Sequence, residues 1–317
     1  MTWLYAVQFA APLILIGWLV WMPARSRLGF VVQVFSSTAA LAAMALQGIW
    51  LLPPWWAPFV FAILLAAAAG MGWRRVRPFS SALPVTWGAW IVLFFFVVLG
   101  TVSTYGTVIA LQSRIAPATG VVNLAFPLEP GRYLIVNGGS NSSTNAHLET
   151  LNVEVPRYAA WRGQSYGVDI VALDGLGLRA RGVQPTDPRA YRIYGAQVLA
   201  PCTGQVIVAV DGIPDMEVPK VDRDHMAGNH VLLRCAEADV LLGHLQPGSV
   251  QVQVGANVAV GDWLGLVGNS GNTGEPHLHI HAQGMGPAEA PLSGEPRPIR
   301  LNGRFVVRGD RIKEPAS

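Results

Sequence analysis

The stretch Glu275-Pro276-His277-Leu278-His279-Ile280-His281 alternates apolar residues with histidines, and it follows the turn-rich run Gly268–Gly274. Turn residues followed by this alternation predict a β-strand, in which residues i, i+2 and i+4 share one face. The three imidazoles are therefore expected to point the same way. Such a cluster is typical of a metal or catalytic site, although a solvated strand face carrying histidines would give the same pattern.

The first third of the 317-residue chain is strongly apolar. Hydrophobic residues make up 51% of the whole sequence, and its mean hydropathy is +0.37. Between Met1 and Ala110 there is no Asp, Glu, Lys or His, and the only charged residues are Arg25, Arg27, Arg74, Arg75 and Arg77. Because so little of this stretch can interact with water, we predict that it is embedded in a membrane.

Four apolar runs approach or exceed the roughly 20 residues that cross a bilayer as a helix. They are Trp3–Met22, Leu28–Leu52, Trp55–Trp73 and Trp87–Leu111. A cleaved signal peptide is not expected, because no basic flank precedes the first run and three more runs follow. No ionisable residue lies inside a run, so we expect no ion or proton pathway. Residues 1–111 therefore read as a four-helix transmembrane anchor, through which an envelope protein partner could dock.

The loops between these runs predict the orientation of the anchor. Arg25 and Arg27 fall in the first connection and Arg74, Arg75 and Arg77 in the third, whereas the second, around Pro53-Pro54, carries no charge. Basic loops stay in the cytoplasm. With four spans, the N-terminus and everything after Leu111 lie outside. We therefore expect a multi-pass protein of the bacterial inner (cytoplasmic) membrane, with its second half on the periplasmic or extracellular side.

The net charge of +3 and the pI near 9.1 do not indicate a nucleic-acid partner. Five of the 22 basic residues belong to the membrane region, which leaves 17 basic against 19 acidic residues from Leu111 onward. The exported part is thus nearly neutral and has no basic stripe, so no nucleic-acid binding is expected.

Residues 112–120 read as a short linker, and residues 121–317 as one exported domain of ordinary size. The domain shows no clear helical period. Short β-rich runs punctuated by Gly, Pro and Asn predict an all-β sandwich or barrel. These runs are Arg132–Val136, Gly167–Leu173, Gln205–Val210, His230–Cys235, Val240–Leu245, Ser249–Val254 and Trp263–Val267.

Cys202 and Cys235 are the only cysteines of the chain. On the outer side of a membrane thiols can be oxidised, so the two residues are candidates for a disulfide. Two buried free thiols would fit the sequence equally well, because nothing in it fixes the distance between them.

The remaining polar candidates differ in their surroundings. His225, in a polar stretch, and His230, at the start of a strand, have no His or carboxylate at ligand spacing, so we expect structural or solvated roles. His244 ends an apolar strand, where a polar ring needs a partner. Asp169 lies inside the apolar run Tyr166–Val171. Because a buried carboxylate is costly unless it is paired or metal-bound, Asp169 is the leading oxygen ligand.

The order of these motifs resembles that of the lysostaphin-type (LytM-like) zinc endopeptidases. The resemblance covers about residues 163–283 and implies an antiparallel β-sandwich or barrel-sandwich hybrid of the lysostaphin-like peptidase type. The motifs that carry it are Gly167-x-Asp169, Val198-x-Ala200-Pro201-x-x-Gly204-x-Val206, Gly228-Asn229, Gly243-His244-Leu245, Val254-x-x-x-Val258-x-x-Gly261-x-x-x-Gly265 and His277-Leu278-His279.

The same resemblance implies roles for four residues. Asp169 and His279 would bind zinc, while His244 and His277 would assist catalysis. The family's first zinc ligand is usually a His four residues before the Asp, and here that position is Ser165. Ser is a poor zinc ligand. We predict that His147, just upstream, replaces it.

Two alternatives to this ligand set stay open. His147 could be an exposed loop residue with no such role. His281 could be the missing ligand instead, since it shares the strand face of His279 and stands where an acidic residue is common in the family.

Three protein ligands leave one position of zinc open for a water, whose pKa falls from 15.7 to about 7. His244 and His277 could then orient that water or donate hydrogen bonds to the developing oxyanion. Because the domain is expected outside the cytoplasmic membrane, the resemblance implies hydrolysis of peptide cross-links in bacterial peptidoglycan.

Two other functions fit parts of the sequence. Ser165 would suit a member that has lost zinc and binds peptidoglycan or activates a partner hydrolase, although such a relic has no reason to keep Asp169, His244, His277 and His279. The Gly-spaced run Val254–Gly268 also resembles lipoyl-like hairpins of carrier and membrane-fusion proteins. Those modules have no use for the His strand, and a carrier hairpin would need a modifiable Lys at its turn, which is absent here.

Overall fold

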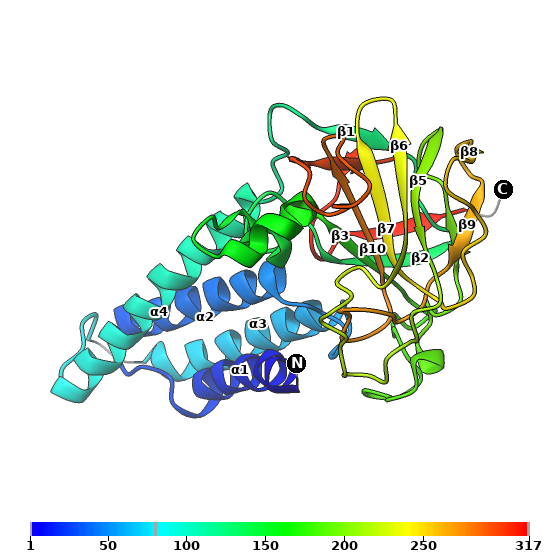
Figure 1. The fold of residues 1–317 in the computed structure, drawn as a ribbon. Helices are drawn as coiled ribbons and strands as arrows, with labels where there is room; N and C mark the ends of the chain where they lie inside the picture. Colours follow the sequence, from blue (N-terminus) through cyan, green and yellow to red (C-terminus); the bar gives the residue numbers. More distant parts are fainter. Residues whose placement is uncertain (1, 79–80, 316–317) are drawn as a thin grey trace. The chain divides into compact units, whose positions relative to one another are not determined.

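The computed structural model describes residues 2–78 and 81–315, and the contacts between residues divide the chain into two compact units (Figure 1). One unit comprises residues 1–112 and is helical. The other comprises residues 113–317 and is rich in β-strands.

The helical unit contains α1 (Thr2–Trp21), α2 (Arg27–Gln47), α3 (Ala57–Val76) and α4 (Trp87–Gln112). By length and composition, α2, α3 and α4 could each cross a membrane, whereas Ala6–Trp21 of α1 is a shorter apolar stretch. The sequence thus predicted a helical region correctly. The fourth span, Trp3–Met22, stays a prediction.

Helices α2 and α4 approach each other closely through small and polar residues. The Ser36 hydroxyl donates a hydrogen bond to the backbone oxygen of Phe96, and a Cβ added at Gly100 would lie 2.5 Å from that hydroxyl. Further along, Gln47 Nε2 donates to the backbone oxygen of Gly106 at 3.0 Å. Small residues that allow close backbone approach, together with interhelical hydrogen bonds, are how helices associate where burial from water gives little driving force.

The β-rich unit is mostly antiparallel. Its main sheet has nine strands in the order β14-β2-β3-β10-β7-β6-β5-β8, with β11 pairing with β10. The smaller sheets are β1-β12-β13, in which β1 and β12 run parallel, and β4-β9. The strands are β1 (Val122–Leu124), β2 (Gly131–Asn137), β3 (Val168–Ala172), β4 (Gln197–Leu199), β5 (Gly204–Val210), β6 (Asn229–Cys235), β7 (Asp239–Leu245), β8 (Asn257–Val258), β9 (Trp263–Leu266), β10 (Leu278–Gln283), β11 (Pro296–Arg297), β12 (Ile299–Leu301), β13 (Arg304–Phe305) and β14 (Arg311–Glu314).

Strand β10 lies between β3 and β7 in the main sheet. Leu278, Ile280 and Ala282 are fully buried in the hydrophobic core. Because side chains alternate along a strand, His279 and His281 project from the opposite face. The structure therefore contains the predicted strand with His279 and His281 on one face, whereas His277, predicted on the same strand, lies just before it.

Two local predictions differ from the structure. Ser249–Val254 forms no strand, because its first backbone N–H groups are bonded to a turn rather than to a ladder: Ser249 N donates to Gln246 O at 3.2 Å, and Val250 N donates to Asp211 Oδ2 at 3.4 Å. The domain is also not purely β. It contains the 3₁₀ helices η1 (Ala146–Leu151), η2 (Pro156–Tyr166) and η3 (Pro188–Ala190). The barrel-sandwich detail stays a prediction.

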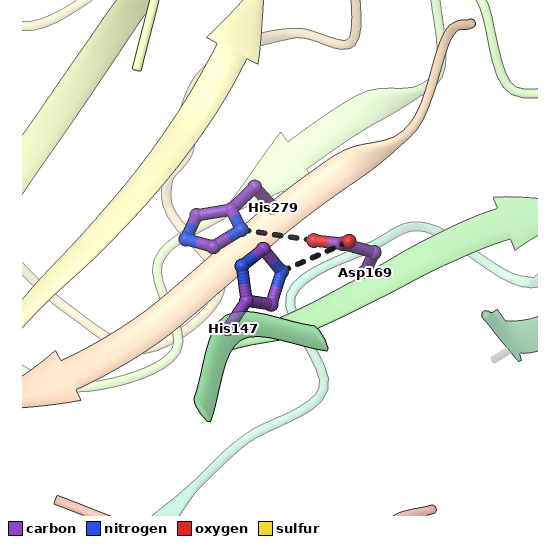
Figure 2. Close-up of side chains that lie close together, drawn as sticks. All are labelled: His147, Asp169 and His279. Carbon is purple, nitrogen blue, oxygen red and sulfur yellow. Dashed lines mark hydrogen bonds and ion pairs between the residues drawn. The ribbon is translucent and has the colours of Figure 1, made fainter. Parts of the chain in front are cut away.

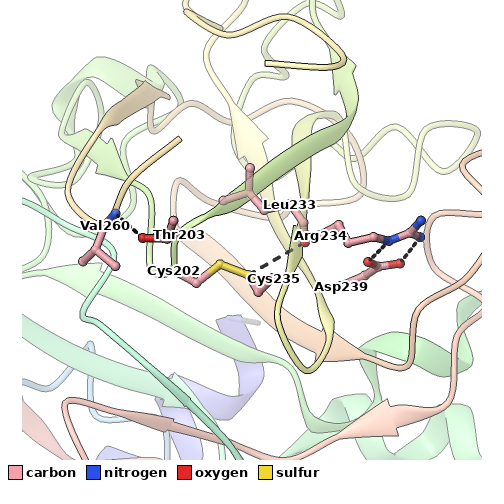
Figure 3. The surroundings of a disulfide bond; sticks show 7 residues. All are labelled: Cys202, Thr203, Leu233, Arg234, Cys235, Asp239 and Val260. Carbon is pink, nitrogen blue, oxygen red and sulfur yellow. Dashed lines mark hydrogen bonds and ion pairs between the residues drawn. A yellow bond between two sulfur atoms is a disulfide. The ribbon is translucent and has the colours of Figure 1, made fainter. Parts of the chain in front are cut away.

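A disulfide joins Cys202, just before β5, to Cys235 at the end of β6, and no described cysteine is free (Figure 3). Next to it, Arg234 Nε and Nη2 each donate a hydrogen bond of 2.9 Å to the buried Asp239, across the hairpin of β6 and β7. The sequence left the disulfide open, and the structure contains it.

Candidate metal centre and active site

Three neighbouring strands bring polar side chains together at one point of the main sheet. Asp169 of β3 pairs with Asn137 of β2 on one side and with His279 of β10 on the other. Directly opposite residues of adjacent antiparallel strands have Cβ atoms about 4.5–5.5 Å apart. The register alone therefore places the Asp169 carboxylate beside the His279 ring.

His147 and His279 converge on the two oxygens of Asp169 (Figure 2). His147 Nε2 lies 3.0 Å from Asp169 Oδ2, and His279 Nδ1 lies 2.9 Å from Asp169 Oδ1. Asn137 Nδ2 also donates to Oδ2, at 2.8 Å. Residues far apart in sequence thus form one compact cluster.

His147 reaches this cluster from η1. Asn145 caps η1 by accepting a hydrogen bond from the backbone N of His147 at 3.1 Å, and its Nδ2 donates to Gly167 O at 3.1 Å. The Thr150 hydroxyl donates to His147 O at 2.7 Å and lies 2.8 Å from the Ser165 hydroxyl. Ser165, at the position of the family's usual ligand, is fully buried and supports the segment that carries His147.

Gly167 makes room for the two imidazoles. A Cβ at this position would lie 2.6 Å from His279 Cε1 and 3.1 Å from His147 Cδ2. Any larger residue would push the rings away from Asp169. The glycine in the Gly-x-Asp motif is therefore a packing requirement of the cluster.

The donor set of the cluster fits zinc. His147, Asp169 and His279 each offer one ligand atom, and all these atoms lie within 4.8 Å of one another. Two imidazole nitrogens and one carboxylate oxygen are ligands that zinc prefers, and three protein ligands are typical of a catalytic site. These residues are thus suited to hold a zinc ion.

The charges of the cluster balance one another. Burial disfavours the ionised form of Asp169, but the charges of His147 and His277, and the hydrogen bonds from His147 and His279, outweigh it and hold the pKa of Asp169 well below its usual value. Burial also lowers the pKa of His147, yet the adjacent Asp169 charge raises it above normal overall. The cluster therefore keeps a carboxylate in the interior.

His244 lies at a bulge between β6 and β7. Asn229 pairs with Leu245 and Val231 with Leu242, so two residues of β7 oppose His230 alone. His244 has φ of 62°, a left-handed conformation that is uncommon for a residue other than Gly. Bulges re-aim side chains and are frequent next to active sites. The bulge turns the His244 ring toward His277, with the ring centroids 4.8 Å apart.

Backbone carbonyls fix the tautomers of His244 and His277. His244 Nδ1 lies 2.9 Å from Ser270 O, and His277 Nδ1 lies 2.9 Å from Glu275 O. A carbonyl oxygen only accepts, so each Nδ1 carries the proton and a neutral ring has its lone pair at Nε2. Burial, with the neighbouring His277 and His279 charges, holds the pKa of His244 well below its usual value.

One cavity with a volume of about 410 Å³ is lined by the three candidate ligands, His147, Asp169 and His279, together with His244 and His277. Its other walls come from η1, η2 and the loops near residues 223 and 272, and include Glu149, Arg157, Tyr158, Trp161 and Arg223. The cavity thus combines the candidate metal ligands with aromatic and charged side chains that can contact a peptide.

The other histidines lie elsewhere. His225 is exposed and bonded to Asp222 at 2.8 Å, and His230 is buried with its Nδ1 2.8 Å from Gly228 O. Their expected structural roles stay predictions.

His281 Nδ1 lies 2.9 Å from His279 Nε2, on the far side of His279 from Asp169.

Sequence reasoning missed several supporting residues, among them Asn137, Asn145, Thr150 and Arg308. Arg308 Nη2 donates to Asn137 Oδ1 at 2.8 Å, and burial lowers the pKa of Arg308 to about 10. The signal that could have found Asn145 is its cap position before Ala146. Arg308 gave no signal, because it lies 139 residues after Asp169 and beyond the motifs.

Residues 190–291 match the model of the protein family described as Peptidase family M23. The chain therefore carries an M23 peptidase domain of the LytM or lysostaphin-like type. No curated protein matches the chain. His244, His277 and His279 lie inside the matched region, whereas His147 and Asp169 precede it.

Similar solved structures include the catalytic domain of the antimicrobial peptidase lysostaphin from Staphylococcus simulans, with 20% identity, 39% of this chain and 71% of that chain covered, and a TM-score of 0.26. A putative peptidase M23 from Pseudomonas aeruginosa has 17% identity, 54% and 48% coverage, and a TM-score of 0.27. A zinc containing peptidase from Vibrio cholerae has 17% identity, 47% and 50% coverage, and a TM-score of 0.23. The chain spans about half the length of the last two, and the TM-scores are low.

Proposed function

We propose that the chain is a membrane-anchored zinc endopeptidase that hydrolyses peptide cross-links of bacterial peptidoglycan. The observation that carries the proposal is the convergence of His147, Asp169 and His279 within 4.8 Å, in the same cavity as His244 and His277. The M23 match supports the peptidase class.

In this proposal His147, Asp169 and His279 hold zinc, which when bound polarises a carbonyl oxygen and lowers the pKa of water to about 7. His244 presents the lone pair of Nε2 to the cavity, because its Nδ1–H is bonded to Ser270 O. It can therefore take a proton from the attacking water at Nε2 and later return it to the leaving amine. His277 presents its Nε2 beside it and orients the same groups.

The proposed location follows from the helices and their charges. Arg25 and Arg27 precede or begin α2, and Arg74, Arg75 and Arg77 end α3. If basic segments stay in the cytoplasm, α4 runs outward and the peptidase domain lies outside, whether or not α1 crosses the membrane. The Cys202–Cys235 disulfide supports this side, since disulfides persist in oxidising compartments.

One observation favours a second candidate function, a non-catalytic domain that binds peptidoglycan or activates a hydrolase. Ser165 occupies the position of the family's usual first ligand, and its hydroxyl is bonded within the protein. The two candidates differ in whether the chain binds zinc.

The test is zinc stoichiometry and peptide release from peptidoglycan, measured on the full-length protein in detergent. We expect about one zinc per chain and hydrolysis in the parent, and neither in His279→Ala. His225→Ala is the matched control, because this exposed histidine is outside the cavity, and it should keep both properties. A folded parent that binds no zinc would instead support the non-catalytic domain.

A further inference from the structure

His281 lies directly behind His279. Both belong to β10 and share one face, His281 is fully buried, and its Nδ1 lies 2.9 Å from His279 Nε2. The other nitrogen of His279, Nδ1, faces Asp169 at 2.9 Å. His279 is therefore held between two partners, one on each ring nitrogen.

Metal binding would decide where the proton of His279 resides, because without a metal its Nδ1–H donates to Asp169 Oδ1. A neutral imidazole has one N–H and one lone pair. If Nδ1 is to bind a metal beside Asp169 and His147, it must present the lone pair, and the proton must be on Nε2. The Nε2–H then points at His281 Nδ1, which can accept it only if His281 carries its own proton on Nε2.

We propose that, when the site holds zinc, His281 is a positioning residue whose Nδ1 accepts a hydrogen bond from His279 Nε2–H, which leaves the Nδ1 lone pair of His279 free to bind the ion beside Asp169 and His147. This inference rests on the zinc site of the proposed function. It also replaces the reading of His281 as a competing ligand, because the His281 nitrogen nearest the cluster is occupied by His279.

An imidazole suits this buried position. An acidic residue, which is common at this position in the family, would accept the same hydrogen bond as a carboxylate, as partners of metal-bound histidines often do. A neutral imidazole offers an acceptor without the negative charge of a carboxylate.

The first test compares zinc affinity of the full-length parent, His281→Leu and His281→Asn by competition with a chelator. Leu has similar bulk and no acceptor, so we expect affinity to fall about 10–100-fold, as for other partners of metal-bound histidines. Asn can place its side-chain oxygen near the position of Nδ1, and it should restore most of the affinity. Unchanged affinity in His281→Leu, or equal losses in both variants, would overturn the proposal.

The second test is independent of whether the Leu variant folds. Nitrogen-15 NMR of the zinc-loaded parent, labelled at histidine, reports which nitrogens carry protons. We expect His281 protonated at Nε2 only, His279 protonated at Nε2 and metal-bound at Nδ1. A His281 protonated at Nδ1, or a His279 bound through Nε2, would overturn the role.

These outcomes separate the inference from the proposed function. Zinc bound with the expected tautomers but no peptide released from peptidoglycan would remove the peptidase proposal and leave the role of His281 intact. Hydrolysis of peptidoglycan by a protein in which His279 and His281 carry their protons on the other nitrogens would support the peptidase proposal and remove the proposed role of His281.

Discussion

The cavity has two sides on which the same residue type is held in different ways. On one side, His147 and His279 direct a nitrogen at the Asp169 carboxylate, at 3.0 and 2.9 Å. On the other, His244 and His277 each bind a backbone carbonyl through Nδ1, and His277 Nε2 comes no closer to Asp169 Oδ1 than 3.6 Å, which is beyond hydrogen-bond distance. A histidine whose ring nitrogen faces the carboxylate is suited to hold a cation. A histidine whose Nδ1–H is bonded to a backbone carbonyl is suited to move a proton at Nε2.

Removing the carboxylate should have the largest effect. In Asp169→Ala both histidines of the first side lose their common partner, and the proposed zinc site loses its only carboxylate. We expect zinc stoichiometry to fall from about one per chain to near zero, with hydrolysis abolished, as measured by metal analysis after dialysis. His225→Ala again serves as control. Retention of stoichiometric zinc would show that Asp169 is not a ligand.

His147→Ala tests which residue completes the first side. The distance of 3.0 Å to Asp169 makes His147 a direct partner, whereas His281 Nδ1 lies 2.9 Å from His279 Nε2, on the side of His279 away from Asp169. We expect zinc affinity to fall by more than the roughly 10–100-fold expected for a residue behind a ligand. Chelator competition on His147→Ala and His281→Leu in parallel measures both losses. A larger loss in His281→Leu would reverse the assignment.

His244→Ala tests the second side. Because His244 makes no hydrogen bond to Asp169, His147 or His279 among the described contacts, zinc stoichiometry should be unchanged. The rate of peptide release should fall by about 10²–10⁴, the usual contribution of a general acid or base. Metal analysis and hydrolysis of the same preparation give both values. Equal loss of zinc in His244→Ala and Asp169→Ala would erase the difference between the two sides.

Much of the first side could be predicted from local sequence. Alternation placed His277, His279 and His281 on one face of a strand, and the apolar surroundings of Asp169 identified a carboxylate that needs partners. Their meeting depends on the register of β3 with β10, which local patterns do not encode. His147 was inferred only because Ser165 left a ligand missing. Nothing in the sequence indicated that η1 would carry it or that Asn145 and Thr150 would hold it.

The second side was harder to predict. The apolar run ending at His244 indicated a strand, but the bulge that turns its ring arises from pairing with β6. The Ser249–Val254 run failed for a related reason. Its alternation fits a strand, yet Gly248 N and Val250 N donate to the Asp211 carboxylate, so the backbone follows a turn and no ladder forms. Side-chain caps and neighbouring strands, rather than periodicity, decide such cases.

The smallest effect is expected from Thr273→Val. The buried Thr273 hydroxyl donates to Glu275 O at 2.7 Å and lies 3.1 Å from His277 Nδ1. Valine removes that hydroxyl at similar volume, but His277 Nδ1–H keeps Glu275 O as its acceptor. Zinc stoichiometry should therefore be unchanged and peptide release only slightly slower. The lost hydrogen bond should lower stability by about 1 kcal/mol, or about 2–4 °C in Tm for a domain of this size. A loss of activity as large as that of His244→Ala would mean that the hydroxyl, rather than the carbonyl, sets the tautomer of His277.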